Sequence, residues 1–165
     1  MQPGWQLGLL ETAAGATDPL GTQRASVLAN PSPGAQTIQQ TLGVFGNYVA
    51  CFSAYLQSNA AGTVTLHRDG TQVTVGVGPS WKRFYVNGLG TSGAAQSSFS
   101  IELAAGQAIN VWGLQVEAQP YPSAYKQTSA ALGIYEETYF ANDELKITST
   151  GVGLSSCEIT LISRI

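Results

Sequence analysis

Aromatic side chains are the residues of this chain whose chemistry is best suited to holding a ligand. A sugar ring stacks on an exposed aromatic face, and amide or carboxylate groups beside that face bind its hydroxyls. We single out Trp5, near the start of the sequence, and Tyr121 and Tyr125, which flank a proline-containing stretch. Each ring could equally pack on a strand beneath it, so both roles stay open. The other aromatic candidates are Tyr48, Tyr55, Tyr85 and Trp112.

The acidic residues do not form the pair that glycoside hydrolysis needs. Glu136 and Glu137 are adjacent, so on a strand their side chains face opposite sides of the sheet. Asp143 and Glu144 fall in a predicted turn, and His67 has no serine or cysteine partner at a catalytic spacing. No G-x-S-x-G or P-loop motif occurs in the sequence. We therefore expect that this protein is not an enzyme.

Two cysteines and one histidine are too few for a cysteine–histidine zinc site. Cys51 and Cys157 are far apart in the sequence, and both lie in strand-like runs. A disulfide between them is chemically possible, but a buried free cysteine also behaves as a small apolar residue. The pairing of the two thiols therefore stays open, and these residues predict no cofactor.

Composition narrows the class of protein. The chain has 165 residues, 44% of them hydrophobic and only 10% charged, with a net charge of −3. The length suits one main domain, and the hydrophobic fraction argues against a disordered chain. Seven Lys and Arg residues are too few for a nucleic-acid footprint. No apolar run approaches the roughly 18 residues of a transmembrane helix, so we expect neither nucleic acid nor membrane as a partner.

The N-terminus suggests where the protein is made. Met1–Trp5 lacks the basic and apolar regions of a secretory signal peptide, so we expect synthesis in a cytoplasm. The low charge and the many Thr, Ser, Gln and Gly residues are typical of an extracellular surface protein, although ordinary enzymes also show low charge. A virion component, assembled inside a cell and exposed later, would account for both the cytoplasmic synthesis and the surface-like composition.

Apolar residues alternate with a period of two in short runs, which is typical of β-strands. Val49–Leu56 is apolar on both faces, as in a strand at the centre of a sandwich. An Asp-Gly pair at positions 69 and 70 joins two alternating runs, which predicts a hairpin. With glycine and serine recurring about every ten residues, the pattern favours an all-β sandwich. The predicted strands are Val49–Leu56, Gly62–His67, Thr71–Val77, Trp81–Val86, Ser97–Leu103 and Ala108–Glu117.

Loops and a rigid connector separate these strands. We expect Glu11–Gln23 to be loop-like, with a turn at Asp18–Gly21, and Ala29–Gly34 to form another loop. Gln119–Ser123 contains two prolines, each of which fixes its own φ, so this segment is predicted to be an extended connector. Three further alternating runs follow it, at 134–140, 144–150 and 156–162. Three short strands cannot bury a face alone, so they must add to the sandwich or pair with another subunit.

The segment Val111–Glu117, followed by Pro122–Tyr125 and Thr128, resembles the last-strand signature of jelly-roll domains of the carbohydrate-binding-module type, families 4 and 9. Such domains recur in phage tail and fibre proteins. The resemblance covers roughly residues 1–128. Its other marks are the early turn Asp18–Gly21, Gln39–Thr41 before a strand, the central strand Tyr48–Leu56, and the strand after the hairpin that begins Trp81–Phe84.

The resemblance implies an all-β jelly-roll β-sandwich over residues 1–128. Residues 129–165 lie outside the resemblance, and from their three alternating runs we expect a C-terminal β extension of three strands used in assembly or subunit contact. It also implies a structural calcium ion, for which Asp18 and Glu117 lie in the matching parts of the chain. The fold by itself does not imply sugar binding. The core residues that it implies are Phe52, Trp81 and Trp112.

These observations leave three hypotheses. The first is a structural protein of a bacteriophage or phage-like particle, in capsid decoration or in a tail or fibre, that contacts other virion proteins as a homo-oligomer, with a trimer favoured. The second is a carbohydrate-binding adhesion or receptor-binding module whose partner is a surface glycan. The third is a glycan hydrolase or lyase, for which the acid pair is missing.

Overall fold

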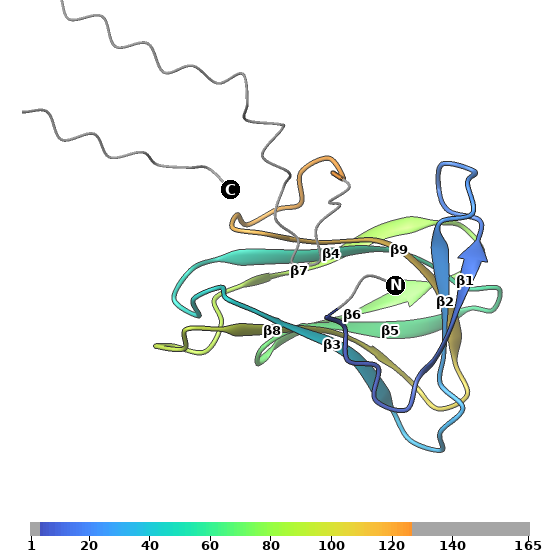
Figure 1. Cartoon of the computed structure of the whole chain (residues 1–165), viewed down its shortest axis with the longest axis horizontal. Coiled ribbons are helices and arrows are strands. Elements are labelled where there is room, and N and C mark those ends of the chain that lie inside the picture. Colours follow the sequence, from blue (N-terminus) through green and yellow to red (C-terminus); the bar gives the residue numbers. More distant parts are fainter. Residues whose placement is uncertain (1–3, 127–165) are drawn as a thin grey trace, which may run out of the picture.

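The computed structural model describes residues 4–126. Within this range the chain contains nine β-strands and no helix. Two antiparallel sheets, with strand orders β1-β2-β9-β4-β7 and β3-β8-β5-β6, lie face to face as a jelly-roll β-sandwich (Figure 1). Within residues 4–126, no helix is long and apolar enough to span a membrane. The strands are β1 (Glu11–Ala16), β2 (Ala25–Ala29), β3 (Gln36–Leu42), β4 (Ala50–Gln57), β5 (Gly62–Arg68), β6 (Thr71–Val77), β7 (Lys82–Gly88), β8 (Ser97–Leu103) and β9 (Ala108–Glu117).

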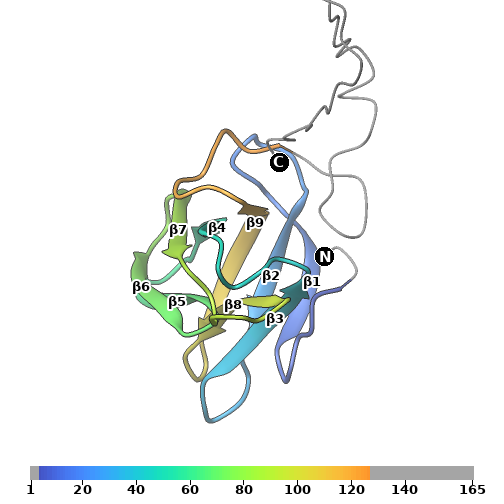
Figure 2. The ribbon, with the colours of Figure 1, turned by 90° about the vertical axis from the view of Figure 1, so that its left-hand side faces the viewer.

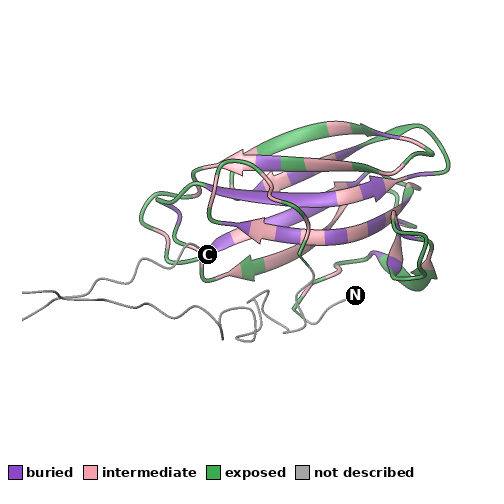
Figure 3. Cartoon of the chain, turned by 90° about the horizontal axis from the view of Figure 1, so that it is seen from above, coloured by how far each residue is buried: buried purple, intermediate pink, exposed green. Residues whose placement is uncertain are grey.

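One hydrophobic core lies between the two sheets. Successive side chains of a strand point to opposite faces, so each strand contributes every second residue to this core. Figure 3 shows the buried residues concentrated along the interior strands, with exposed residues at the rims. Full burial of such a side chain contributes about 1.5–3 kcal/mol to stability. The largest apolar side chains that are fully buried are Leu28, Ile38, Phe52, Leu56, Val64, Leu66, Val86, Phe99, Ile101, Leu103 and Ile109.

The strands from β4 onward confirm the pattern read from the sequence. β4 lies between β9 and β7 and is buried on both faces over most of its length, which explains its two-sided apolar composition. β5 and β6 form the predicted hairpin, in which Asp69 has a positive φ of 47°. A two-residue Asp-Gly loop of this kind suits the twist of a hairpin.

The N-terminal third departs from the prediction. Glu11–Gln23 is not loop throughout, because β1 occupies its first six residues. β1 is an edge strand of small, exposed residues, so it has no alternation to detect, and its backbone pairing with β2 defines it. Its register shifts between Ala14 and Ala16, where Gly15 has a φ of +91°. Gln39–Thr41 lies inside β3 rather than before a strand.

The predicted strands at 134–140, 144–150 and 156–162 lie outside the described residues, as do Thr128 and the domain boundary beside it. The predictions for Cys157 and for the acidic pairs at Glu136–Glu137 and Asp143–Glu144 also concern residues outside this range.

Two loops, residues 43–49 and 88–96, are joined by backbone hydrogen bonds at the end of the sandwich that faces the viewer in Figure 2. The Gly46 N–H donates to the Ala94 carbonyl at 2.9 Å, and the Gly46 carbonyl accepts from the Gly90 N–H at 2.8 Å. Gly46 is buried, and a Cβ at this position would fall on the carbonyl group of Thr91. The loop over residues 43–49 therefore requires glycine here for space.

Substituting Gly46 by alanine is expected to destabilise the fold by about 1–3 kcal/mol, because backbone must move to admit the methyl group. Gly43 in the same loop has open space at its Cβ position, so Gly43→Ala is the matched control and should change stability by less than about 1 kcal/mol. Urea unfolding of the two variants measures the difference. Equal midpoints would contradict the packing described here.

Candidate functional site

The outer face of the five-stranded sheet carries polar and aromatic side chains in rows that cross β7, β4 and β9. Register places Tyr85, Ser53 and Gln115 in one row. The next row towards the β4 C-terminus holds Arg83, Tyr55 and Trp112, and the row beyond Ser53 on the other side holds Asn87, Cys51 and Glu117. Because cross-strand neighbours lie about 5 Å apart, side chains in one row are in contact range.

A β-bulge in β9 creates this composition. The pairing of β9 with β4 shifts at Gly113, which has a φ of +63°. Before the bulge, Val111 faces the core and Trp112 faces out; after it, Leu114 packs on the core and Gln115 faces out. An unbulged strand would turn Gln115 inward, since a shift of one residue exchanges the two faces.

The segment that follows β9, residues 118–126, crosses this outer face, and we call it the closing segment. It runs above β4 and β9, coloured orange in Figure 1. Glu117 accepts hydrogen bonds from the Ser123 backbone N–H at 3.0 Å and from the Ser123 hydroxyl. The Gln115 side-chain oxygen accepts from the Lys126 N–H at 3.2 Å, and Asn87 donates to the Pro120 carbonyl. The predicted extended connector is thus held along its length by side chains of the sheet.

Arg83 joins β7 to its neighbour β4, to β9 beyond it and to the closing segment. Its guanidinium donates to the Ser53 hydroxyl at 2.9 Å and to the Ser123 carbonyl, and lies 3.9 Å from the Glu117 carboxylate. It also stands over the Tyr55 ring, 5.5 Å from the centroid. A planar guanidinium suits this position because it donates in several fixed directions and stacks on a ring.

Three aromatic rings form a cluster between the sheet and the closing segment. Trp112 contacts Tyr55 at 5.2 Å and Tyr125 at 4.4 Å between ring centroids. Burial raises the pKa of the Tyr125 phenol. Gly113 lies beneath both tyrosines, since a Cβ there would be 3.1 Å from Tyr55 and 3.2 Å from Tyr125. Tyr125 therefore covers the Trp112 ring itself.

A second aromatic pair on the same face is open to solvent. Tyr121 of the closing segment is 65% exposed and meets Tyr85 of β7, which is 39% exposed, edge to face at 6.3 Å. Gln119 donates to the Tyr121 carbonyl at 2.8 Å and to the Glu117 carboxylate at 3.0 Å. This pair is an aromatic surface fixed at its base by amide and carboxylate groups.

The structure brings together two of the three predicted sugar contacts. Tyr121 and Tyr125 lie on the outer face, whereas Trp5 is half-buried and packs on Phe52 of the core at 5.9 Å. Phe52 is fully buried. The expected core positions of Trp81 and Trp112 are wrong: both are half-buried and neither belongs to the core cluster. Trp112 follows Val111, which faces inward, so its own side chain must face out.

The two carboxylates predicted to hold calcium accept hydrogen bonds from groups of the chain itself. Asp18 accepts from the Leu20 N–H at 2.8 Å, the Thr22 N–H at 3.0 Å and the Thr22 hydroxyl. Burial opposes its ionisation, but these bonds outweigh burial and lower the Asp18 pKa. Glu117 faces Ser123, Gln119 and Arg83. Among residues 4–126 no group of three or more His, Cys, Asp or Glu side chains could hold a metal ion, and the calcium ion stays a prediction.

The remaining reactive groups in the described range have structural surroundings. Cys51 is fully buried, and burial together with the nearby Glu117 raises the pKa of its thiol to about 11. The thiol is therefore protonated at neutral pH and a poor nucleophile. His67 lies on the outer face of the other sheet, with its Nε2 3.6 Å from the Glu102 carboxylate.

Sequence reasoning missed the network centred on Arg83, Ser53 and Gln115. One signal for it is present in the sequence. Apolar residues alternate through Ile109 and Val111, and the alternation resumes at Leu114 one residue out of phase. That shift at a glycine marks a bulge and places Gln115 on the face of Trp112.

No protein-family model and no curated protein sequence matches the chain. Among solved structures it is similar to a family 4 carbohydrate-binding module, with a TM-score of 0.54 and 14% identity over 70% of this chain and 86% of that one. It is also similar to the CBM22-1 xylan-binding domain of Paenibacillus barcinonensis Xyn10C, with a TM-score of 0.56 and 15% identity over 68% and 84% of the two chains. A third is the Clostridium thermocellum xylanase 10B CBM22-1–GH10 structure with xylohexaose, at TM-score 0.56 and 16% identity, where the match spans 72% of this chain and 26% of that one. The chain thus has the jelly-roll fold of carbohydrate-binding modules.

Replacing Gly113 by alanine is expected to destabilise the protein by about 1–3 kcal/mol, because a side chain strains the positive φ and presses on two tyrosine rings. Near-UV circular dichroism should change with it, since the Tyr55–Trp112–Tyr125 cluster shifts. Gly76→Ala in β6 meets no atom within 4 Å and serves as the control. A Gly113→Ala protein as stable as the Gly76→Ala protein would argue against the bulge.

Proposed function

We propose that this protein is a non-catalytic carbohydrate-binding module that holds a neutral glycan on the outer face of its five-stranded sheet. The observation that carries the proposal is the exposed Tyr85–Tyr121 pair, two aromatic rings fixed edge to face beside polar side chains. The jelly-roll fold shared with the family 4 module and the xylan-binding domain supports it as an analogy of fold.

The chemistry of the pair suits a sugar ring. The C–H face of a pyranose packs on an aromatic ring, and phenol hydroxyls exchange hydrogen bonds with sugar hydroxyls. Asn87 and Gln119 hold the backbone carbonyls of Pro120 and Tyr121, so the rings are positioned before a ligand arrives. Pre-organisation of this kind lowers the entropic cost of binding. Trp112 is half-buried and packs against Tyr125, whereas Tyr85 and Tyr121 are both exposed.

A binding role also fits the surroundings of the described carboxylates. Glu117 faces Arg83 and Ser123, and Asp18 closes its own turn. Asp69 accepts from the Ser98 N–H at 2.7 Å, and Glu102 faces His67. Each of these four carboxylates has a partner in the protein, and a general acid or nucleophile in glycoside hydrolysis instead needs a second carboxyl group across the scissile bond.

Tyr121→Ala and Tyr85→Ala are each expected to weaken glycan binding about tenfold, a loss of about 1.4 kcal/mol of ring contact. Tyr121→Phe keeps the ring and should keep most of the affinity. Leu20, 71% exposed in the Asp18–Gly21 turn, gives the control Leu20→Ala. A glycan array of neutral oligosaccharides that includes xylohexaose identifies the probe, and isothermal titration then measures its affinity for each variant. Unchanged affinity in both tyrosine variants would refute the site.

The location of the protein is a separate proposal. The charge-poor composition and the family resemblance support a place on a phage or phage-like particle, where a homo-oligomeric glycan-binding module would act in adhesion. No contact among residues 4–126 bears on the particle or on the oligomeric state. Co-sedimentation of the native protein with purified particles on a density gradient is expected. Free protein at the top of the gradient would leave the module without a virion role.

A further inference from the structure

A second exposed aromatic pair lies at the loop end of the sandwich. Phe45 is 55% exposed and Tyr48 63% exposed, and their rings meet edge to face at 6.0 Å with an angle of 82°. Both belong to one turn, closed by the Tyr48 N–H donating to the Phe45 carbonyl at 3.1 Å. Leu89, also exposed, adds an apolar side chain from the neighbouring loop. The function proposed above uses none of these residues.

The turn that carries the pair is built into the fold. Backbone hydrogen bonds join Gly46 to Ala94 and to Gly90, as described above. The Asn47 side-chain oxygen accepts from the Gly93 N–H at 3.0 Å. The two loops, residues 43–49 and 88–96, therefore form one unit. The backbone that carries the aromatic rings is therefore held in place, which lowers the entropic cost of binding a ligand.

Two charged side chains, Arg68 and Asp69, contact the backbone of this unit. Arg68 is fully buried at the end of β5, and its guanidinium donates to the Tyr48 carbonyl at 2.7 Å. The Asp69 carboxylate accepts from the Thr91 N–H at 3.2 Å and the Ser98 N–H at 2.7 Å. The Arg68 guanidinium uses Nη2 for the bond to Tyr48, while its Nε and Nη1 are buried and have no hydrogen-bond partner among the described residues. Both charged groups anchor the loops through backbone contacts and lie beneath the exposed rings.

The exposed surface of the unit is neutral. Residues 43–49 and 88–96 contain no Asp, Glu, Lys or Arg. The aromatic pair is accompanied by exposed amide and hydroxyl side chains, namely Asn47, Thr91 and Ser92. Apolar rings edged by neutral hydrogen-bonding groups match a ligand with C–H faces and hydroxyl edges. A charged ligand would find no counter-charge in these two loops.

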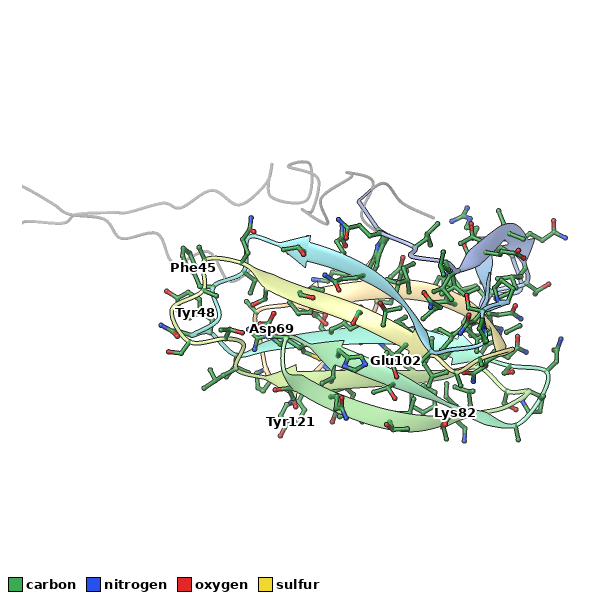
Figure 4. The ribbon with its side chains drawn as sticks, turned by 90° about the horizontal axis from the view of Figure 1, so that it is seen from below. Phe45, Tyr48, Asp69, Lys82, Glu102 and Tyr121 are labelled. Carbon is green, nitrogen blue, oxygen red and sulfur yellow. The ribbon has the colours of Figure 1, made fainter. Side chains whose placement is uncertain are left out.

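This pair is distinct from the surface around Tyr121. Figure 4 shows Phe45 and Tyr48 together at the loop end near Asp69, with Tyr121 apart from them. The two pairs come from different elements: one from the 43–49 loop, the other from β7 and the closing segment. They can therefore be occupied independently.

We propose that the Phe45–Tyr48 pair is a second binding site for a neutral saccharide, separate from the Tyr85–Tyr121 site. Two sites on one chain would let it hold two positions of a branched or clustered glycan, and the second contact then forms at a high effective concentration. Weak single-site affinities would combine into tight attachment to a dense glycan surface.

The test compares the full chain with two double variants, Phe45→Ala/Tyr48→Ala and Tyr85→Ala/Tyr121→Ala, and with the quadruple variant. The probe is the best neutral oligosaccharide on a glycan array that includes xylohexaose and cellohexaose. Isothermal titration is expected to give two saccharides per native chain, one for each double variant and none for the quadruple variant. Phe45→Tyr/Tyr48→Phe keeps both rings and should keep both sites. Thermal melting of each variant confirms that it is folded.

The outcomes separate this proposal from the function proposed above. If Phe45→Ala/Tyr48→Ala binds like the native chain while Tyr85→Ala/Tyr121→Ala does not bind, the second site is overturned and the first stands. The reverse result would overturn the first site alone. An array on which no neutral glycan binds would overturn both. Sedimentation velocity gives one more refuting result: a native dimer that Phe45→Ala/Tyr48→Ala converts to a monomer would make the pair a self-association surface.

Discussion

One extra residue in β9 determines which side chains the five-stranded sheet shows to the outside. Gly113 lets the strand place Val111 in the core on one side of the bulge and Leu114 on the other. As a consequence Trp112 and Gln115 share the outer face, where an unbulged strand would separate them. The bulge also lets two tyrosine rings approach the backbone, because glycine has no Cβ to exclude them. The polar rows, the closing segment and the aromatic cluster all depend on this change of phase.

The few charged residues in the described range serve mainly to connect segments. Arg83 links three strands to the closing segment, Arg68 holds the 43–49 loop from within, and Asp69 ties the hairpin turn to the start of β8. The two loops around Phe45 and Tyr48, residues 43–49 and 88–96, therefore show rings, amides and hydroxyls and no charged side chain. That surface is suited to neutral ligands, because an uncharged sugar does not have to displace a salt bridge or lose a strongly hydrated partner.

Much of the fold could be predicted from the sequence, because the strands from β4 onward alternate strongly and are separated by clear turn residues. β1 could not be predicted, since its exposed small residues show no alternation and only pairing with β2 defines it. The family pattern predicts a core position for Trp112, but the inward-facing Val111 beside it places the Trp112 side chain on the outer face. Tyr121 and Tyr125 could be singled out by their place beside the prolines. Arg83 could not, because its role arises from three strands and the closing segment meeting at one point.

The closing segment also has a mechanical consequence. Its contacts are arranged in series from Lys126 and Tyr125 back through Ser123 to Pro120, and each joins the segment to the face of the sheet. Tension applied to the chain at residue 126 would therefore break these contacts one after another. The force would reach β9 only after the hydrogen bond from Arg83 to the Ser123 carbonyl has broken. Because β9 lies between β2 and β4, the strand itself would resist the same pull through two ladders in shear. The domain would thus unfold in two stages under force: the closing segment would detach at low force, and the β-sandwich would open at a higher one.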